Sequence, residues 1–572
     1  MICGVKLFEC ALWLSGGAFD HVEKLMFGAG AGSPSRSTSL ALLIPYFLLL
    51  LWRISYDIHR YIMIGKYYRY RRNRAPEPAR RYADKELPEV TIQLPIFNEQ
   101  YVVDRLIDTV CRIDYPREKL EIQVLDDSTD ETVEVASSRV AYYAALGHNI
   151  RYLHRPDRTG YKAGALEAGT KQARGEFIAI FDADFMPPPE WLRKVVHYFT
   201  DPKIGVVQTR WEHINRNYSL LTKAQAILLD GHFVMEQGAR SRSGVFFNFN
   251  GTAGIWRRSA IEDAGGWQHD TLTEDTDISY RAQLKGWRFI YLQDMGCPSE
   301  LPVEMTAFKT QQARWAKGQT QVAIKLLPRI LKSDVPPVVK FEAWYHLTGF
   351  ISNPLTLLLS LPILPAIRIW PERDWLQFFL INLPVVVTST LSITSFYLLS
   401  QKELYPGRWL RTLIYLPVVM AVAISLLFTN CRAWLEAVFG RPSSFVRTPK
   451  YRVTAKSDRP LASKYRKRLG LVPWIELALG AYFLVTLVYA VRNGNFLTAF
   501  FLLFFVSGYW YSGAMSLLQG RCDGFLRRAQ SADSGSMWTP PALPCAAQSG
   551  RVEAVCASAG QYNSGRVTCE KA

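Results

Sequence analysis

Apolar and polar positions are distributed unevenly along this chain of 572 residues. One polar stretch, from about Glu86 to Lys332, is long enough to bury a core of its own. Outside it, several apolar runs approach the ~20 residues that a helix needs to cross a bilayer. These runs are Thr38–Ile54, Ala343–Ile367, Trp375–Leu399, Leu410–Thr429, Leu471–Val491 and Phe496–Leu518. A buried core helix would explain one such run, but several runs outside one polar stretch predict a membrane protein.

Short β-rich segments alternate with helix-like segments inside the polar stretch. The pattern predicts strands at Val90–Leu94, Glu121–Leu125, Asn149–His154 and Phe177–Phe181, and helices at Tyr101–Arg112, Glu131–Leu146 and Lys162–Ala173. Such alternation indicates a mostly parallel sheet with helices on both faces. The predicted fold is therefore α/β and Rossmann-like, combined with α-helical transmembrane segments.

Paired acids follow the fourth predicted strand. Parallel strands joined by right-handed crossovers end at one edge of the sheet, and open α/β sheets bind their ligands at this edge. Asp182 and Asp184 lie there, one residue apart, and such carboxylates suit a hard divalent ion that also holds phosphates. This spacing also occurs by chance, but its position predicts an Mg²⁺ or Mn²⁺ site, where the ion would assist a diphosphate leaving group.

Two candidate nucleotide contacts lie on neighbouring segments. The run Asp126–Asp130 could simply cap the next helix, but two adjacent acids at a strand end exceed what a cap needs. Carboxylates accept strong hydrogen bonds, so we predict that Asp126 and Asp127 contact a base and a ribose. Lys162 follows a glycine loop at a helix start and could be only a solvated lysine; we predict that it reaches a pyrophosphate, aided by backbone N–H groups.

Two later segments complete the candidate set. Glu274 and Asp275 begin a helix and could serve only its dipole. Transfer to a hydroxyl needs a carboxylate base, so we predict this role for Asp275, with Glu274 beside the acceptor. The helix that carries Arg314 and Trp315 is expected to rest partly on the membrane surface. In addition, Arg314 can bind diphosphate oxygens bidentately, and Trp315 can stack on an acceptor sugar.

Basic residues outnumber acidic residues by 67 to 50, which gives a net charge of +17. Nucleic-acid binding is one interpretation, but the basic residues cluster beside apolar runs, at Arg69–Arg81 and Arg447–Arg468. Such clusters are typical of cytoplasmic faces and of contact with anionic lipid. We therefore expect a lipid bilayer and no nucleic acid as partner, with the polar domain in the cytoplasm. Nine cysteines without a CxxC motif indicate a reducing compartment.

The motifs resemble those of inverting glycosyltransferase family 2. The resemblance rests on the segments 93–99, 123–130, 160–166, 181–185 and 249–257, and it covers roughly Glu86–Leu327. Within that family the chain is most similar to the cellulose-synthase-like A and C proteins, the mannan and glucan synthases. Thr273-Glu274-Asp275 and Gln311-Gln312-Ala313-Arg314-Trp315 resemble the TED and QxxRW motifs of the same family.

This resemblance implies a GT-A catalytic domain on a membrane channel. It implies nucleotide contacts from Asp126, Asp127, Lys162, Asp182 and Arg314, metal contacts from Asp182 and Asp184, a base role for Asp275, and acceptor contacts from Trp315 and Glu274. The segment Phe445–Lys450 resembles the gating-loop motif FxVTxK through Phe445, Thr448 and Lys450. It departs from that motif where Arg447 replaces Val.

The expected enzyme is a membrane-embedded, processive, inverting β-hexosyltransferase. It would polymerise hexose from UDP-glucose or GDP-mannose onto a growing β-linked glycan, a glucan, mannan or glucomannan with expected β-1,4 linkage, and export it. The expected location is a bacterial inner membrane, or a Golgi membrane if the source is eukaryotic. One alternative is a glycolipid synthase that transfers a single hexose to a lipid. Another is a transport or scaffold protein with a degenerate transferase domain, which the complete set of acids disfavours.

Four regions are expected along the chain. They are an N-terminal segment with the first transmembrane helix (1–66), the GT-A domain with interfacial helices (67–332), a transmembrane channel region whose gating-loop-like segment is 441–468 (333–518), and a disordered tail (519–572). Three crossings between the GT-A domain and residues 441–468 would place this basic segment outside, against the positive-inside rule. One run is therefore expected to be interfacial or re-entrant, and Pro417 favours Leu410–Thr429.

Overall fold

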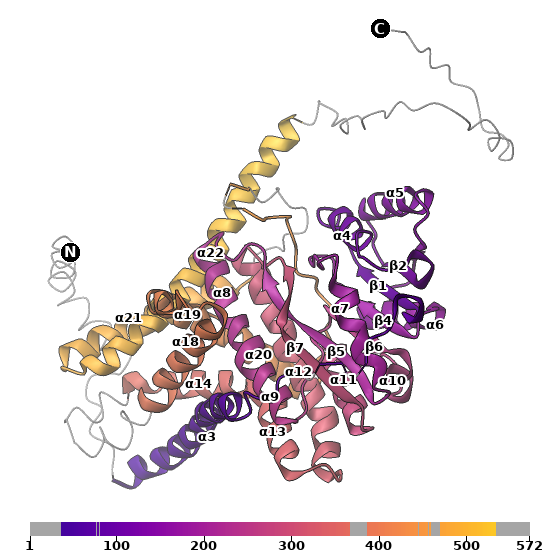
Figure 1. Ribbon diagram of the computed structural model, residues 1–572. Coiled ribbons are helices and arrows are strands. Elements are labelled where there is room, and N and C mark those ends of the chain that lie inside the picture. The colour runs from indigo at the N-terminus through magenta and orange to yellow at the C-terminus, as the bar shows by residue number, and fades with distance from the viewer. Residues whose placement is uncertain are drawn as a thin grey trace. The chain divides into compact units, whose positions relative to one another are not determined.

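The computed structural model describes residues 36–365 except 76 and 79, and residues 386–533 except 444, 456 and 459–469. The chain divides into two compact units, Met1–Asp523 and Gly524–Ala572. A seven-stranded sheet with surrounding helices occupies the first unit, which also contains long apolar helices (Figure 1). Most of the expected disordered tail, and the start of the expected N-terminal segment, lie outside the described residues.

The strands of this sheet are β1 (Val90–Ile96), β2 (Leu120–Asp126), β3 (Ile150–His154), β4 (Phe177–Ile180), β5 (Ile204–His213), β6 (Gly254–Arg257) and β7 (Arg288–Ser299). Their order is β3-β2-β1-β4-β6-β5-β7. β6 is antiparallel to both of its neighbours, and the other adjacent pairs are parallel. The predicted mostly parallel, Rossmann-like sheet is therefore confirmed, and the four strands expected from sequence correspond to β1–β4.

The helices around the sheet are α4 (Val103–Val110), α5 (Thr132–Ala145), α6 (Tyr161–Gln172), α7 (Trp191–Val196), α8 (Leu220–Asp230), α9 (Gly238–Ser243), α10 (Arg258–Asp263), α11 (Glu274–Leu284) and α12 (Met305–Lys332). The three helices expected from sequence correspond to α4, α5 and α6. A π-helical turn, η4 (Gly231–Gln237), joins α8 to α9.

Two hydrophobic clusters cover opposite faces of the sheet, because successive side chains of a strand point to opposite sides. Val124 of β2 belongs to one cluster together with Leu106 of α4. The next residue, Leu125, belongs to the other cluster together with Leu166 of α6 and Ile278 of α11. Figure 1 shows α4 and α5 on one side of β1 and β2, with α6 on the other. Since helices cover both faces, the carboxyl ends of the strands remain as the edge where a ligand can bind.

The remaining helices are largely apolar. They are α3 (Arg36–Arg69), α13 (Pro337–Thr348), α14 (Ser352–Ser360), α18 (Ser392–Leu404), α19 (Thr412–Ser425), α20 (Leu427–Val438), α21 (Val472–Arg492) and α22 (Phe496–Asp533). Among the described residues, four helical segments are long and apolar enough to cross a membrane: Pro337–Pro365, Trp409–Val438, Val472–Arg492 and Phe496–Gln519. These segments correspond to four of the apolar runs in the sequence, so the protein is a membrane protein.

The other two runs have different outcomes. Thr38–Ile54 forms the first half of α3, and Trp375–Leu399 is described only from residue 386 onward, where it forms the helical turn η7 (Val386–Leu391) and the start of α18. The run expected to be irregular, Leu410–Thr429, lies within Trp409–Val438, whose length and composition suit a full crossing. The structure therefore gives no support to choosing that run as the irregular one. The end of this segment, α20, packs along α12.

Candidate active site

A cleft opens at the carboxyl ends of the sheet strands. Its lining includes Glu99, Asp127, Asp182 and Asp184 from strand ends, Lys162, Glu274, Asp275, Gln311, Arg314 and Trp315 from helices, and Phe445, Arg447, Thr448 and Lys450 from the chain after α20. All but one of the site residues proposed from sequence lie in this lining. The exception is Asp126, which is fully buried beneath it.

The two adjacent acids at the end of β2 have different surroundings. The Asp126 carboxylate accepts hydrogen bonds from the backbone N–H of Ser128, at 2.8 Å, and from the Tyr152 hydroxyl, at 2.6 Å. Asp127 lines the cleft, and both of its carboxylate oxygens accept hydrogen bonds from Arg155, at 2.8 and 2.6 Å. Asp126 therefore orders the loop, and Asp127 is the acid that this loop presents to a ligand.

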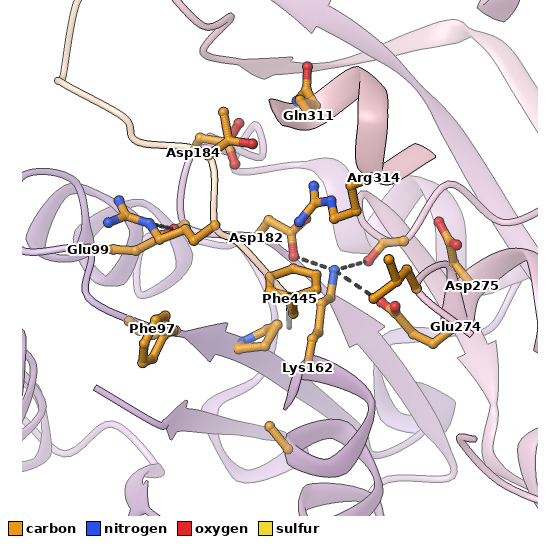
Figure 2. Close-up of a pocket in the computed structure, with 18 of the residues that line it drawn as sticks. Phe97, Glu99, Lys162, Asp182, Asp184, Glu274, Asp275, Gln311, Arg314 and Phe445 are labelled. Carbon is orange, nitrogen blue, oxygen red and sulfur yellow. Dashed lines mark hydrogen bonds and ion pairs between the residues drawn. The ribbon is translucent and has the colours of Figure 1, made fainter. Parts of the chain in front are cut away.

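Lys162 occupies the centre of the cleft. Its ammonium lies 2.5 Å from Asp182 Oδ1 and 3.9 Å from Glu274 Oε1, and it donates a hydrogen bond of 2.9 Å to the Gly251 carbonyl (Figure 2). Burial acts to lower the pKa of Lys162, but the carboxylates of Asp182 and Glu274 outweigh it and raise that pKa above its ordinary value. Lys162 is therefore a permanent cation at the edge of the sheet.

Gly251 brings the backbone against this centre. Its φ of +80° lies in the left-handed region, which glycine adopts without steric cost. A Cβ atom at this position would lie 2.9 Å from Asp275 Oδ2 and 3.5 Å from Lys162 Nζ. Both the conformation and the space therefore favour glycine here, within the segment 249–257 that carries part of the family resemblance.

Asp275 lies in the first turn of α11, where its Oδ1 accepts a 2.7 Å hydrogen bond from the Thr276 N–H. Burial and the neighbouring Glu274 carboxylate raise the pKa of Asp275 to about 7, against the opposing effect of Lys162. A general base works best when its pKa lies near the operating pH. The geometry therefore gives Asp275 the environment of a base for a hydroxyl proton.

The gating-loop-like segment enters the same cleft through two ion pairs. Arg447 Nε lies 2.8 Å from Glu99 Oε1, and its guanidinium also donates to the Asn98 carbonyl. Lys450 Nζ lies 2.6 Å from Asp184 Oδ2. The position at which this segment departs from the FxVTxK motif thus forms a specific contact with a strand end.

Aromatic and cationic side chains surround Phe445. Its ring centroid lies 4.5 Å from Arg314 Cζ and 5.7 Å from Arg158 Cζ, and the ring stacks on Tyr161 at a centroid distance of 5.8 Å. Arg158 also lies 3.3 Å above the Phe97 ring centroid. These contacts place two guanidinium groups at the mouth of the cleft, where they suit an anionic ligand.

Sequence reasoning missed Glu99 and Arg158, which line the cleft, and Arg155, which pairs with the lining residue Asp127. Glu99 stands in the 93–99 segment, just after β1, so its position at a strand end was an available signal. Burial and the carboxylate of Asp184 raise the pKa of Glu99 to about 7, although Arg447 acts in the opposite direction. No pattern in the sequence links Arg155 to Asp127 or Arg158 to Phe97.

The donor set at the end of β4 fits a hard divalent cation. Asp182 accepts a hydrogen bond from the Lys162 ammonium and Asp184 accepts one from the Lys450 ammonium. Both carboxylates therefore already bind a positive charge. Within the described residues, no group of three or more histidine, cysteine, aspartate or glutamate side chains converges to hold a metal. Mg²⁺ is commonly bound by one or two carboxylates together with substrate phosphates and water, and this pair of acids matches that pattern.

Comparison with known proteins identifies the family. The model of a protein family described as "Glycosyltransferase like family 2" matches residues 88–318. "Glucomannan 4-beta-mannosyltransferase 7" of Arabidopsis thaliana is 34% identical over 450 residues, which cover 74% of this chain and 77% of that protein. The chain belongs to glycosyltransferase family 2. It is therefore a hexosyltransferase with a GT-A fold, as expected from its sequence.

Other similar proteins of family 2 have related names. "Probable glucomannan 4-beta-mannosyltransferase 15" of Arabidopsis thaliana is 33% identical, over 77% of this chain and 83% of that protein. "Glucomannan 4-beta-mannosyltransferase 1" of Oryza sativa subsp. japonica is 38% identical, over 58% of this chain and 66% of that protein. Among solved structures, "Mannosyltransferase PcManGT from Pyrobaculum calidifontis in complex with GDP-Man and Mn2+" is 21% identical, with a TM-score of 0.47, over 68% of this chain and 100% of that chain.

The raised pKa of Asp275 predicts the pH dependence of this family 2 enzyme. Because the base must be a carboxylate, kcat/KM is expected to rise with pH around 7 rather than around the ordinary value of 3.8. Glu274→Gln removes one cause of the shift and should move this acid limb to lower pH. A pH–rate profile of both proteins measures the effect. Glu99→Gln is the matched control, since it removes a carboxyl of similar pKa that does not contribute to the pKa of Asp275. If kcat/KM rises over the same pH range in the unaltered enzyme, Glu274→Gln and Glu99→Gln, the assignment of Asp275 is contradicted.

Proposed function

We propose that this protein is a processive, inverting β-mannosyltransferase that polymerises mannose from GDP-mannose into a β-1,4-linked mannan or glucomannan. The observation that carries the proposal is its similarity to glucomannan 4-beta-mannosyltransferases over about three quarters of the chain. The cleft supports it, since cations and carboxylates converge there as a nucleoside diphosphate sugar requires.

In this proposal the donor lies along the edge of the sheet. Asp127 accepts hydrogen bonds from the base or ribose. Lys162 and Arg314 neutralise the diphosphate, and Arg314 can do so bidentately. Asp182 and Asp184 hold a divalent cation, Mg²⁺ or Mn²⁺, which when bound stabilises the negative charge of the departing nucleoside diphosphate.

Asp275 acts on the acceptor. It accepts the proton of the attacking hydroxyl, whose oxygen forms a bond to the anomeric carbon from the face opposite the diphosphate. The bond from the anomeric carbon to the diphosphate oxygen breaks, GDP leaves with the electron pair, and the configuration is inverted. Glu274 lies beside Asp275 and is proposed to contact the acceptor. Because Lys162 remains charged, it offsets the negative charge of these acids throughout the reaction.

We also propose that the active site faces the cytoplasm and that the glycan leaves through the apolar helices. The basic residues beside the apolar runs support this orientation. A long polar glycan cannot cross lipid without a protein path. Phe445, Thr448 and Lys450 are proposed to act as a gating loop, supported by their position in the cleft.

Trp315→Ala is expected to shorten the polymer more than it slows donor hydrolysis. Trp315 lines the cleft on α12, and its large apolar ring is proposed to stack on the acceptor sugar. Chromatography of labelled product measures the length, and release of free labelled mannose measures hydrolysis, because GDP is released in both reactions. Trp344→Ala, which removes an exposed tryptophan of α13, is the matched control. Unaltered product length in Trp315→Ala would remove the acceptor role.

The proposed function is tested by supplying purified protein in lipid with Mn²⁺ and either labelled GDP-mannose or labelled UDP-glucose. The expected result is a polymer from GDP-mannose, and linkage analysis should show β-1,4-mannosyl residues. Use of UDP-glucose alone would contradict the proposed donor. A product containing one sugar on a lipid would instead support the glycolipid synthase alternative.

A further inference from the structure

Two buried lysines flank the part of α12 that lines the cleft. Lys309 and Lys317 are only 7% and 3% exposed. Between them, Gln311, Arg314 and Trp315 face the active site. A buried lysine that loses its acidic partner is strongly destabilising, so each of these residues must be paired. Neither lysine takes part in the chemistry proposed above, and their partners lie on two different apolar helical segments.

Lys309 docks α12 on α21 and α22. Its ammonium lies 2.6 Å from Glu476 Oε2 of α21 and donates a 2.9 Å hydrogen bond to Ser516 of α22. Ser512 of α22 donates to the same Glu476 oxygen, at 3.1 Å. Glu476, Ser512 and Ser516 are all fully buried. At the start of α12, the Met305 N–H also donates to Gln519 of α22, at 3.0 Å.

Close packing fixes the partner of Lys309. A Cβ atom on Gly480 of α21 would lie 2.1 Å from Trp510 Cδ1 of α22, and one on Gly513 of α22 would lie 2.8 Å from Leu477 Cγ of α21. Small residues at such positions allow helix backbones in a membrane to approach closely. Glu476 directly precedes Leu477 on α21, and Ser512 of α22 donates to its carboxylate, so the closely packed pair α21 and α22 holds this acid.

Lys317, near the middle of α12, joins this helix to α20 and to the chain that follows α20. Its ammonium donates a 2.7 Å hydrogen bond to the Arg441 carbonyl and lies 3.3 Å from Glu436 Oε2 of α20. Arg441 lies four residues before Phe445, the first residue of the segment Phe445–Lys450 that enters the cleft. Lys317 therefore joins α12, the end of an apolar helix and the start of the gating-loop-like segment.

We propose that Lys309 and Lys317 are positioning residues, which lock α12 to Glu476 and Glu436 on two separate apolar helical segments and thereby hold Trp315 against the acceptor. The proposal rests on the proposed function, because it concerns the acceptor side of the same cleft. The physical reason is that small displacements of a group that orients a reactant slow transfer steeply. Water needs no such orientation, so loss of either lock should favour hydrolysis of the donor over transfer.

The test compares transfer with hydrolysis in Lys309→Met and Lys317→Met. In both, the ratio of mannose transferred to mannose released as free sugar is expected to fall by about 10- to 100-fold, with shorter product. The exchange Lys309→Glu/Glu476→Lys keeps an ion pair and should recover most of the ratio. Equal losses of transfer and hydrolysis, or no recovery in the exchange variant, would overturn the inference.

Asp230→Asn is the matched control. Asp230 is 2% exposed; it accepts a hydrogen bond from Gln401 of α18 and pairs with Arg216, and among the described residues its hydrogen bonds and ion pairs do not reach α12. It should lower the melting temperature much as Lys309→Met does, but leave the transfer-to-hydrolysis ratio unchanged. If both variants change the ratio equally, the lysines are merely structural and the inference fails.

The outcomes separate this inference from the proposed function. If the unaltered protein uses UDP-glucose and not GDP-mannose, the proposed donor is wrong and the same ratio is measured with UDP-glucose. If it transfers from neither donor, the proposed function fails, and amide hydrogen exchange over residues 311–315 decides the inference. Exchange there should be faster in Lys309→Met than in Asp230→Asn; equal exchange in the two variants overturns it.

Discussion

Asp275→Asn is expected to abolish polymer formation while leaving GDP binding nearly intact. The amide oxygen can still accept the hydrogen bond from the Thr276 N–H, so α11 keeps its first turn. It cannot accept a proton from the acceptor, and removal of a positioned general base slows reactions by about 10²–10⁴-fold. Initial rates with labelled GDP-mannose measure the loss, and calorimetric titration with GDP measures binding.

The matched control for this variant is Glu274→Gln, which changes the adjacent acid in the same turn. It should retain far more transfer than Asp275→Asn, because it removes a neighbouring charge and leaves the base in place. Turnover of Asp275→Asn within about tenfold of the unaltered enzyme would be inconsistent with the loss expected for a general base. Asp275 would then have to be removed from that role.

Asp184→Ala is expected to have the second largest effect, on metal-dependent binding of the donor. Stabilisation of leaving-group charge by a divalent ion contributes several kcal/mol, and each 1.4 kcal/mol corresponds to about tenfold. Transfer should therefore fall by at least about 100-fold, and GDP binding should lose most of its dependence on Mn²⁺. Titrations of GDP with and without Mn²⁺ measure this dependence.

Lys450→Ala separates the two consequences of removing the Asp184 carboxylate. Asp184→Ala also releases the Lys450 ammonium, which lies 2.6 Å from Oδ2. If the metal assignment is right, Lys450→Ala keeps the dependence of GDP binding on Mn²⁺, because the acid remains. Unchanged dependence on Mn²⁺ in Asp184→Ala would refute the assignment.

The half of the sheet built from β1–β4 could be predicted because its signals are local. β1, β2 and β4 are short buried runs, β3 is a partly buried one, and each of the first three strands is followed by a helix. β6 has only four residues, and β7 contains Gly296 and Pro298, so neither shows an extended apolar pattern. The pairing of β5 with β7 also shifts register between Thr209 and Arg210. Such a register shift depends on how two strands pair, so the sequence of one strand alone does not predict it.

The site was predictable for the same reason, and only to the same extent. Residues at strand ends and helix starts were found because rules about sheet edges and helix termini place them. Asp126 shows the limit, since adjacent side chains at the end of a strand point to opposite sides and only Asp127 reaches the cleft. Arg447 and Glu99 are 348 residues apart, and Lys309 and Glu476 are 167 apart. Such pairs form only when the whole chain has folded, and the sequence around either residue alone does not indicate its partner.

Gly251 has a practical consequence for engineering this enzyme. A Cβ atom at that position would lie 2.9 Å from Asp275 Oδ2 and displace this carboxylate, and its left-handed backbone would also be strained. A substitution that narrows this wall of the pocket is therefore expected to move the proposed base, Asp275. Redesign of donor preference has to start from lining residues on other elements, such as Trp211 of β5 or Gln311 of α12.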